Sequence, residues 1–303
     1  MNGRAKKHDG SHQPARLICS FCLAIFFFNL FQPAQAASPA GSKSPRIVST
    51  NLCTDQLGLM LAPEKLLSVT WMAADREESP LWEKARKKHV NYGTAEEILS
   101  LKPDLVLAGN YTTRFTVGLL QHQNIPVYEM MPPDSLKGVR GNILKVAEIL
   151  SVEEKGRKTV RLLEKAMADL APQDGRRPKA LVYRAGGFTS GGAGLVDDLI
   201  TQVGLLNMMA DESRNWGRYI SMEELIYLHP DVIILETYRA HDSSLANALL
   251  EHPAFKSVLA RTVVVSIRSS DVTCGTLAMI EAAKAMAAAR HQVLQQKQTW
   301  QNR

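Results

Sequence analysis

Residues 96 to 107 read EEILSLKPDLVL, and residues 223 to 234 read EELIYLHPDVII. The second stretch repeats the first 127 positions later, with the same paired glutamates, the same proline and the same aspartate. In each copy, two carboxylates favour the first turn of a short helix, and the proline ends that helix. The aliphatic run after Pro-Asp is typical of a buried parallel strand. One helix-Pro-Asp-strand connection is commonplace in α/β proteins, but two matched copies predict two similar lobes.

The first 36 residues have the pattern of a secretory signal peptide. Four basic residues precede a mostly apolar stretch, residues 17–31, which is followed by the small-residue site Ala34-Gln35-Ala36. The apolar stretch is short for a membrane span of about 20 residues, so the alternative of an anchoring helix is less favoured. We therefore expect a periplasmic protein whose signal peptide, residues 1–36, is cleaved near Ala36.

Cleavage there leaves 267 of the 303 residues, with 32 basic and 29 acidic side chains and a formal charge of +3. This charge is too small to indicate nucleic-acid binding, and we expect no such partner. Cys53 and Cys274 remain after cleavage and lack the C-x-x-C spacing of a zinc or redox site. Three states stay open for them: a disulfide, a thiolate at a bound metal, or inert packing.

The mature sequence alternates strands and helices on either side of a purely helical stretch, which predicts parallel sheets. We expect a linker at 37–44, an N-terminal lobe at 45–133, a bridging helical segment at 134–177 and a C-terminal lobe at 178–303. Within the bridging segment, Asp134 is expected to cap one helix. The sequence Ser-Val-Glu-Glu at 151–154 is expected to form a capping box for a second helix.

Ligands of open parallel sheets bind beyond the carboxyl ends of the strands, where this chain concentrates aromatic and arginine residues. Aromatic rings suit a broad, partly apolar ligand, and guanidinium groups suit carboxylates and other oxyanions. Taken singly, loop arginines are usually solvated and loop aromatics often pack locally. The candidate ligand-binding residues are Trp71, Tyr111, Arg114, Arg184, Phe188, Trp216, Arg218, Tyr238, Arg239 and Arg268.

Four segments together resemble the periplasmic substrate-binding proteins of ABC importers for iron-siderophore complexes and cobalamin. They are RIVSTNLCTDQL at 46–57, NYGTAEEILSLKPDLVLAG at 91–109, GGFTSGGAGLVDDLITQVGLLNMM at 186–209 and ISMEELIYLHPDVIIL at 220–235. The resemblance extends over almost the whole mature chain. It implies an α/β fold of two lobes with mainly parallel sheets, joined by one long bridging helix, with the ligand in a cleft between the lobes.

The resemblance also gives the repeated glutamates a role. In such proteins one exposed glutamate on each lobe contacts arginines of the permease dimer at the inner membrane, and Glu96 and Glu223 occupy the matching places. Simple helix capping is the alternative for both. We expect a monomer with no covalently bound cofactor and no metal ligands of its own. Its cargo is expected to be an anionic iron chelate of the siderophore type, with cobalamin or haem as the alternative.

Other classes of function fit the sequence less well. The glycine-rich GGFTSGGAG at 186–194 lacks the features of a phosphate loop, a G-x-S-x-G nucleophile elbow and a G-x-G-x-x-G motif, so we do not expect an enzyme. The six histidines of the mature chain are scattered, which disfavours a bare zinc or manganese site. A ligand sensor that keeps this fold without a role in transport remains a further alternative.

Overall fold

The computed structural model describes residues 45–210, 217–238, 253–260 and 262–301. The predicted signal peptide and linker lie outside these residues. In the described part of the chain, no helix has the length and apolar character needed to cross a membrane.

The first lobe is built on a five-stranded parallel sheet of order β3-β2-β1-β4-β5. Its strands are β1 (Ile47–Ser49), β2 (Leu66–Thr70), β3 (His89–Asn91), β4 (Leu105–Gly109) and β5 (Val127–Met130). Its helices are α1 (Leu52–Leu61), α2 (Trp82–Ala85), α3 (Ala95–Ser100) and α4 (Arg114–His122), with short 3-10 turns η1 (Pro63–Lys65) and η2 (Trp71–Ala74). β1 lies at the centre of this sheet, which explains why its side chains are buried.

The second lobe contains a four-stranded parallel sheet of order β11-β10-β6-β8 and a small antiparallel pair, β7 and β9. Its strands are β6 (Lys179–Arg184), β7 (Phe188–Thr189), β8 (Leu206–Asn207), β9 (Arg218–Tyr219), β10 (Val232–Thr237) and β11 (Val263–Arg268). Its helical elements are η3 (Ala185–Gly187), α7 (Leu195–Gln202), α8 (Met222–Leu228), α10 (Pro253–Leu259), α11 (Ser269–Val272) and α12 (Met279–Gln301).

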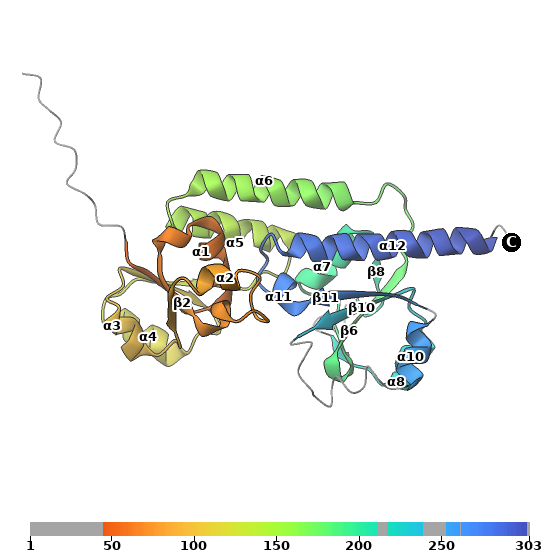
Figure 1. Cartoon of the computed structure of the whole chain (residues 1–303), viewed down its shortest axis with the longest axis horizontal. Coiled ribbons are helices and arrows are strands. Elements are labelled where there is room, and N and C mark those ends of the chain that lie inside the picture. Colours follow the sequence, from red (N-terminus) through yellow and green to blue (C-terminus); the bar gives the residue numbers. More distant parts are fainter. Residues whose placement is uncertain (1–44, 211–216, 239–252, 261, 302–303) are drawn as a thin grey trace, which may run out of the picture. The chain divides into compact units, whose positions relative to one another are not determined.

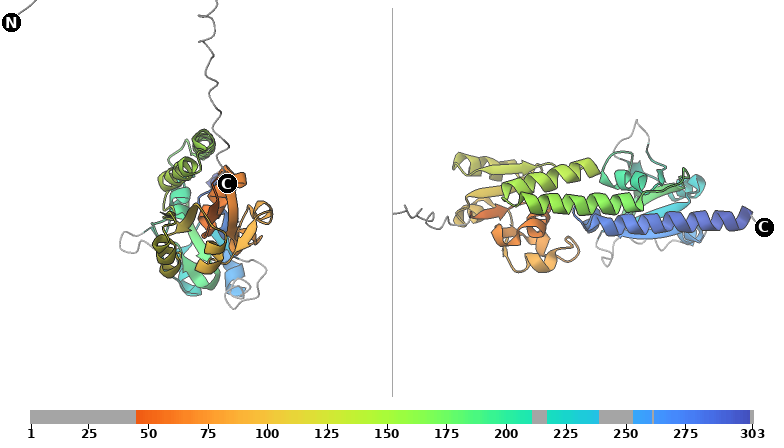
Figure 2. Two further views of the ribbon diagram at one scale, coloured as in Figure 1. Left: turned by 90° about the vertical axis from the view of Figure 1, so that its left-hand side faces the viewer. Right: turned by 90° about the horizontal axis from the view of Figure 1, so that it is seen from above.

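Two helices, α5 (Leu136–Ile149) and α6 (Glu153–Leu170), connect the two sheets in sequence. They run side by side, and α12 packs against α6 (Figures 1 and 2). A methyl group placed at Gly156 would lie 2.4 Å from Cβ of Ala147, so the absence of a side chain at Gly156 allows α5 and α6 to approach closely. A single hydrophobic cluster contains side chains from both sheets and from α5, α6 and α12.

The caps of these two helices differ from the sequence prediction. Ser135, and not Asp134, is the N-cap of α5, and its Oγ accepts a hydrogen bond from N of Gly138 at 3.1 Å. The predicted capping box at the start of α6 is wrong. Ser151 has a positive φ of 51°, and the N-cap, Val152, has no oxygen in its side chain to accept a bond.

The repeated phrase forms the same local structure in both lobes. The residue before each proline, Lys102 or His229, has a positive φ, 46° and 45° respectively, so the helix ends there through left-handed backbone. Each aspartate then forms hydrogen bonds with the backbone of a residue at the start of a neighbouring strand. Oδ2 of Asp104 accepts from N of Arg46 at 2.7 Å, and Asp104 N donates back to Arg46 O at 2.9 Å.

Asp231 makes the same two bonds to Lys179, each at 2.9 Å. The Pro-Asp part of the phrase is therefore structural in both lobes. It joins the start of β4 to that of β1, and the start of β10 to that of β6.

Candidate functional site

In the first lobe, the predicted residues follow the carboxyl ends of β2 and β4. Trp71 begins η2 directly after β2, and Tyr111 lies in the turn after β4, with both side chains exposed. Arg114 begins α4 and pairs with Glu129 of β5, with Nη1 3.1 Å from Oε2. The aromatic rings are therefore available to a ligand, while the nearby guanidinium already has a carboxylate partner.

In the second lobe, the last residue of β6 forms an ion pair across the sheet. Arg184 is the register partner of Glu236 on β10, and its Nη2 lies 2.6 Å from Glu236 Oε2. The carboxylate is buried, and its Oε1 also accepts a hydrogen bond from Ser269 Oγ at 3.0 Å. The Arg184 guanidinium also lies 5.6 Å from the centre of the Phe188 ring, a cation–π distance.

The antiparallel pair β7 and β9 holds the next group of predicted residues. Phe188 faces Tyr219 in register, and the two rings meet edge to face with centroids 5.3 Å apart. The neighbouring Arg218 donates from Nη1 to Glu224 Oε2 at 2.8 Å, and this bond raises the pKa of the guanidinium. Because Glu224 lies on α8, the ion pair joins the β7–β9 pair to the start of that helix.

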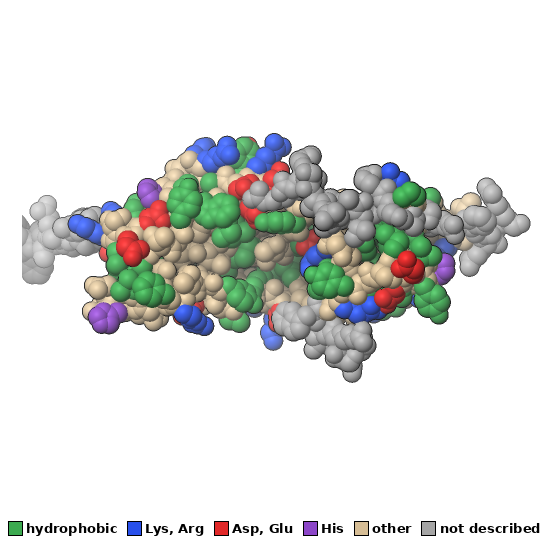
Figure 3. Space-filling model, turned by 90° about the horizontal axis from the view of Figure 1, so that it is seen from below, with side chains coloured by type: hydrophobic (Ala, Val, Ile, Leu, Met, Phe, Trp, Pro, Cys, Tyr) green, Lys and Arg blue, Asp and Glu red, His purple; other side chains and the backbone are tan. Residues whose placement is uncertain are grey.

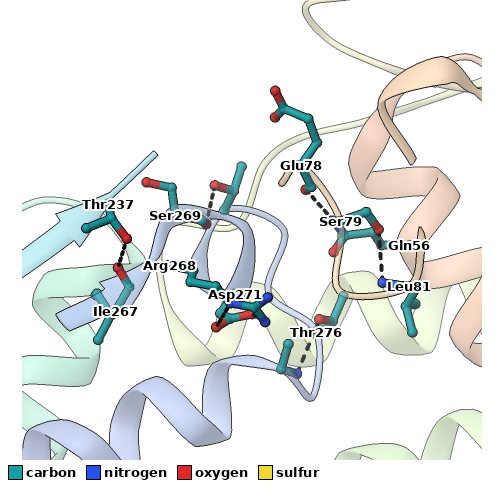
Figure 4. Close-up of polar contacts among 12 residues, drawn as sticks. Gln56, Glu78, Ser79, Leu81, Thr237, Ile267, Arg268, Ser269, Asp271 and Thr276 are labelled. Carbon is teal, nitrogen blue, oxygen red and sulfur yellow. Dashed lines mark hydrogen bonds and ion pairs between the residues drawn. The ribbon is translucent and has the colours of Figure 1, made fainter. Parts of the chain in front are cut away.

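Arg268, at the end of β11, is bound by Asp271 of α11. Its Nη2 lies 2.6 Å from Oδ1 and its Nε lies 3.0 Å from Oδ2, which is a bidentate ion pair (Figure 4). Asp271 is buried and Arg268 is exposed. All four predicted arginines within the described residues therefore have carboxylate partners.

Tyr238 connects the second lobe to the first. It follows β10, and its hydroxyl donates to Oε1 of the buried Glu78 at 2.5 Å. Figure 4 shows Glu78, Gln56 and Ser79 of the first lobe opposite Ser269 and Arg268 of the second. The residues at the carboxyl ends of the two sheets are thus brought to a common boundary.

Cys53 and Cys274 form a disulfide across the same boundary, with Cα atoms 4.8 Å apart. Cys53 lies in the first turn of α1, and Cys274 follows α11. Of the three states that the sequence left open, the structure contains the bonded one. Neither sulfur is therefore a thiolate ligand for a metal in this state.

The repeated glutamates begin α3 and α8 and are both exposed: Glu96 in the first lobe and Glu223 in the second. Two predicted ligand-binding residues, Trp216 and Arg239, lie outside the described residues. Within the described ranges there is no group of three or more His, Cys, Asp or Glu side chains that could hold a metal ion.

The sequence prediction did not include the carboxylates that bind the candidate ligand-binding residues. Glu236, Asp271 and Glu78 are all buried and all hold residues that were predicted to contact ligand. The buried position of Glu236 could have been predicted, because it is a charged residue within the apolar strand VIILET. Such a residue is rarely buried without a partner.

The space-filling view in Figure 3 shows hydrophobic side chains interspersed with both acidic and basic ones on one face of the molecule. Positive and negative side chains lie close together on this face.

Comparison with known proteins identifies the family. The family described as "Periplasmic binding protein" matches residues 47–261, more than half of the chain. This chain is a member of the periplasmic binding protein family. The match places it among substrate-binding proteins and not among enzymes, and it implies an exported protein.

A cobalamin-binding protein of Halobacterium salinarum is 25% identical to this family member over 207 residues. The match covers 65% of the chain and 55% of the relative, so the chain spans about half the length of the curated relatives it matches.

Solved structures share the fold of this periplasmic binding protein. The periplasmic heme-binding protein RhuT from Roseiflexus sp. RS-1 has a TM-score of 0.66 and 24% identity over 82% of this chain and 99% of its own. The vitamin B12 binding protein BtuF of Vibrio cholerae has a TM-score of 0.62 and 17% identity over 82% and 98%. These likenesses confirm the α/β fold with parallel sheets in two lobes that the sequence predicted.

Proposed function

We propose that this protein captures a large, flat metal macrocycle, cobalamin or haem, and delivers it to the permease of an ABC importer. The observation that carries the proposal is the contrast between aromatic and cationic residues at the carboxyl ends of the strands. The rings of Trp71 and Tyr111 are open to solvent, whereas Arg114, Arg184, Arg218 and Arg268 are each paired with a carboxylate.

The aromatic residues favour a broad apolar ligand. The side chains of Trp71 and Tyr111 are 42% and 81% exposed at the ends of β2 and β4. Rings of this size gain a large contact area when they cover a flat ligand, at a small cost in side-chain entropy. A macrocycle offers such a surface, and rings that follow two strands of one sheet suit its width.

The paired charges disfavour a polyanionic ligand. Arg114, Arg184, Arg218 and Arg268 each carry one positive charge, and their partners Glu129, Glu236, Glu224 and Asp271 carry four negative charges. A polyanionic siderophore complex would have to compete with these carboxylates for the guanidinium groups. The paired carboxylates therefore reverse the preference drawn from the sequence, in which the arginines alone favoured an anionic chelate.

The relatives support the same class of ligand. The curated relatives bear the name cobalamin-binding protein, and the solved structures of this fold include heme-binding and vitamin B12 binding proteins. Cobalamin and haem share a flat, metal-centred macrocycle, and they differ in charge because haem carries two propionates. Binding measurements with both will separate them.

The ligand prediction is tested by titrating the purified, oxidised protein with cyanocobalamin, hemin and a ferric tris-catecholate, followed by absorbance and tryptophan fluorescence. We expect micromolar or tighter binding of one macrocycle and much weaker binding of the catecholate. Trp71→Ala and Tyr111→Ala should each weaken binding about tenfold, and Tyr227→Ala on the distant part of α8 should not. Preferential binding of the catecholate would contradict the proposed ligand.

Delivery is proposed to depend on Glu96 and Glu223, one on each lobe. A carboxylate in the first turn of a surface helix contributes only about 0.3–1 kcal/mol through the helix dipole, so changing it should leave the fold intact. We expect Glu96→Lys and Glu223→Lys to abolish transport while ligand affinity stays unchanged. Normal transport by the double variant would show that these glutamates do not dock the protein.

A further inference from the structure

The repeated phrase extends further towards the N-terminus than its glutamates. Tyr92 and Tyr219 also lie 127 positions apart, and each stands two residues before the N-cap of its helix, Thr94 of α3 or Ser221 of α8. The two tyrosine side chains are exposed to nearly the same extent, 72% and 71%. A large ring is therefore presented to solvent at the same place in both lobes.

The second glutamate of each phrase is engaged within its own lobe. Glu97 Oε2 accepts a hydrogen bond from N of Tyr92 at 2.7 Å, and Glu224 forms the ion pair with Arg218. The first bond joins the start of α3 to Tyr92 itself. The second joins the start of α8 to Arg218, the residue before Tyr219. Each lobe thus fixes its tyrosine relative to the first turn of the helix through the second glutamate.

The first glutamate of each phrase, Glu96 or Glu223, is exposed and follows its tyrosine by four residues. We propose that Tyr92 with Glu96, and Tyr219 with Glu223, form two equivalent contact sites for the two subunits of a dimeric permease. This inference rests on the proposed delivery function and adds an aromatic contact to it. A surface that one chain presents twice fits a partner that also presents its own surface twice.

The chemistry of the pair defines what the partner must offer. An arginine can form an ion pair with the carboxylate and stack on the tyrosine ring. Tyrosine is also among the residues that contribute most to binding energy at protein interfaces. One arginine on each permease subunit would therefore satisfy one site, and the two sites together would orient the binding protein on the dimer.

The chain supplies a control away from the two helices. Leu162 is 50% exposed on α6 and lies outside both copies of the repeated phrase. Figure 1 draws α6 on the opposite side of the fold from α3 and α8. Loss of this apolar side chain should therefore have no effect on docking.

The test measures docking of the full-length secreted protein on its cognate permease–ATPase complex in lipid nanodiscs by biolayer interferometry. Tyr92→Ala and Tyr219→Ala are each expected to raise the Kd about tenfold, and the double variant about 100-fold because the two sites lie in different lobes. Tyr92→Phe and Tyr219→Phe should stay within threefold of the unchanged protein, since the ring remains. Ligand affinity and thermal unfolding temperature are measured on every variant.

The outcomes separate this inference from the function on which it rests. If Glu96→Lys and Glu223→Lys abolish docking while the tyrosine variants dock normally, the tyrosine contacts are wrong and the docking function stands. If neither set of variants affects docking, both fail. An equal loss for Leu162→Ala, or a loss of ligand affinity in Tyr219→Ala that accounts for its docking defect, would also overturn the inference.

Discussion

The Cys53–Cys274 disulfide should contribute strongly to the stability of this protein. The bond joins residues 221 positions apart, so it closes most of the mature chain into one loop. In the chain-entropy model, a loop of this length restricts the unfolded state by about 5 kcal/mol at 25 °C, and measured disulfides typically contribute about 2–4 kcal/mol. We therefore expect the free energy of unfolding to fall by about 2–5 kcal/mol when the bond is removed.

The assay is urea unfolding of the mature protein, followed by tryptophan fluorescence and circular dichroism, before and after reduction. Thiol titration establishes how many sulfhydryl groups are free in each sample. The double variant Cys53→Ser with Cys274→Ser serves as the control, because its unfolding should not respond to reductant. A change of less than about 0.5 kcal/mol, in a sample whose bond is shown to be broken, would refute the reasoning.

Three further predictions concern stability in urea. Burial raises the pKa of Asp55 to about 7, so the folded protein keeps a proton that the unfolded chain releases near pH 4. The free energy of unfolding should therefore fall as the pH rises from about 4 to 7, and Asp55→Asn should flatten this dependence. An unchanged slope in the variant would contradict this role of Asp55. Gly156→Ala should destabilise by about 1–3 kcal/mol because its methyl group meets Ala147, whereas Gly141→Ala, on the open face of α5, should stabilise by about 0.5–1 kcal/mol. Asp231→Ala should cost about 1–3 kcal/mol through its lost bond to the backbone at the start of β6, and an unaltered midpoint would show that this bond is dispensable.

The sequence predicted the elements whose signals are local and strong. Long aliphatic runs such as those of β4 and β10 indicated buried parallel strands, and the repeated phrase indicated two lobes. β3, the three-residue strand His89–Asn91, was missed because it is short and lies at the edge of its sheet. It also buries a polar residue, Asn91, whose Nδ2 donates to Ser49 O at 2.9 Å and to Ser68 Oγ at 2.8 Å. These bonds satisfy the buried amide, but a polar residue interrupts the apolar pattern from which a buried strand is predicted.

Helix starts were predicted less accurately than helices. Ser151 satisfied the pattern of a capping box, yet its backbone adopts a positive φ and the helix starts one residue later. The competing requirement is the tight turn between α5 and α6, in which N of Ser151 donates to Glu148 O at 2.9 Å. The geometry of the connection thus prevailed over the preference of one side chain for a capping position.

The arginines show which part of a binding site can be read from a sequence and which part needs the fold. Arg268 and Asp271 are three residues apart at a junction between a strand and a helix, so their bidentate ion pair could be predicted from the local sequence. Arg184 and Glu236 are 52 residues apart, and they meet only because β6 and β10 are neighbours in one particular register. A loop arginine can therefore be assigned to an anion-binding site only after the fold shows whether a carboxylate already pairs with it. The partners of the four candidate arginines in the described part of the chain are carboxylates, so the charge of these four is balanced within the protein itself.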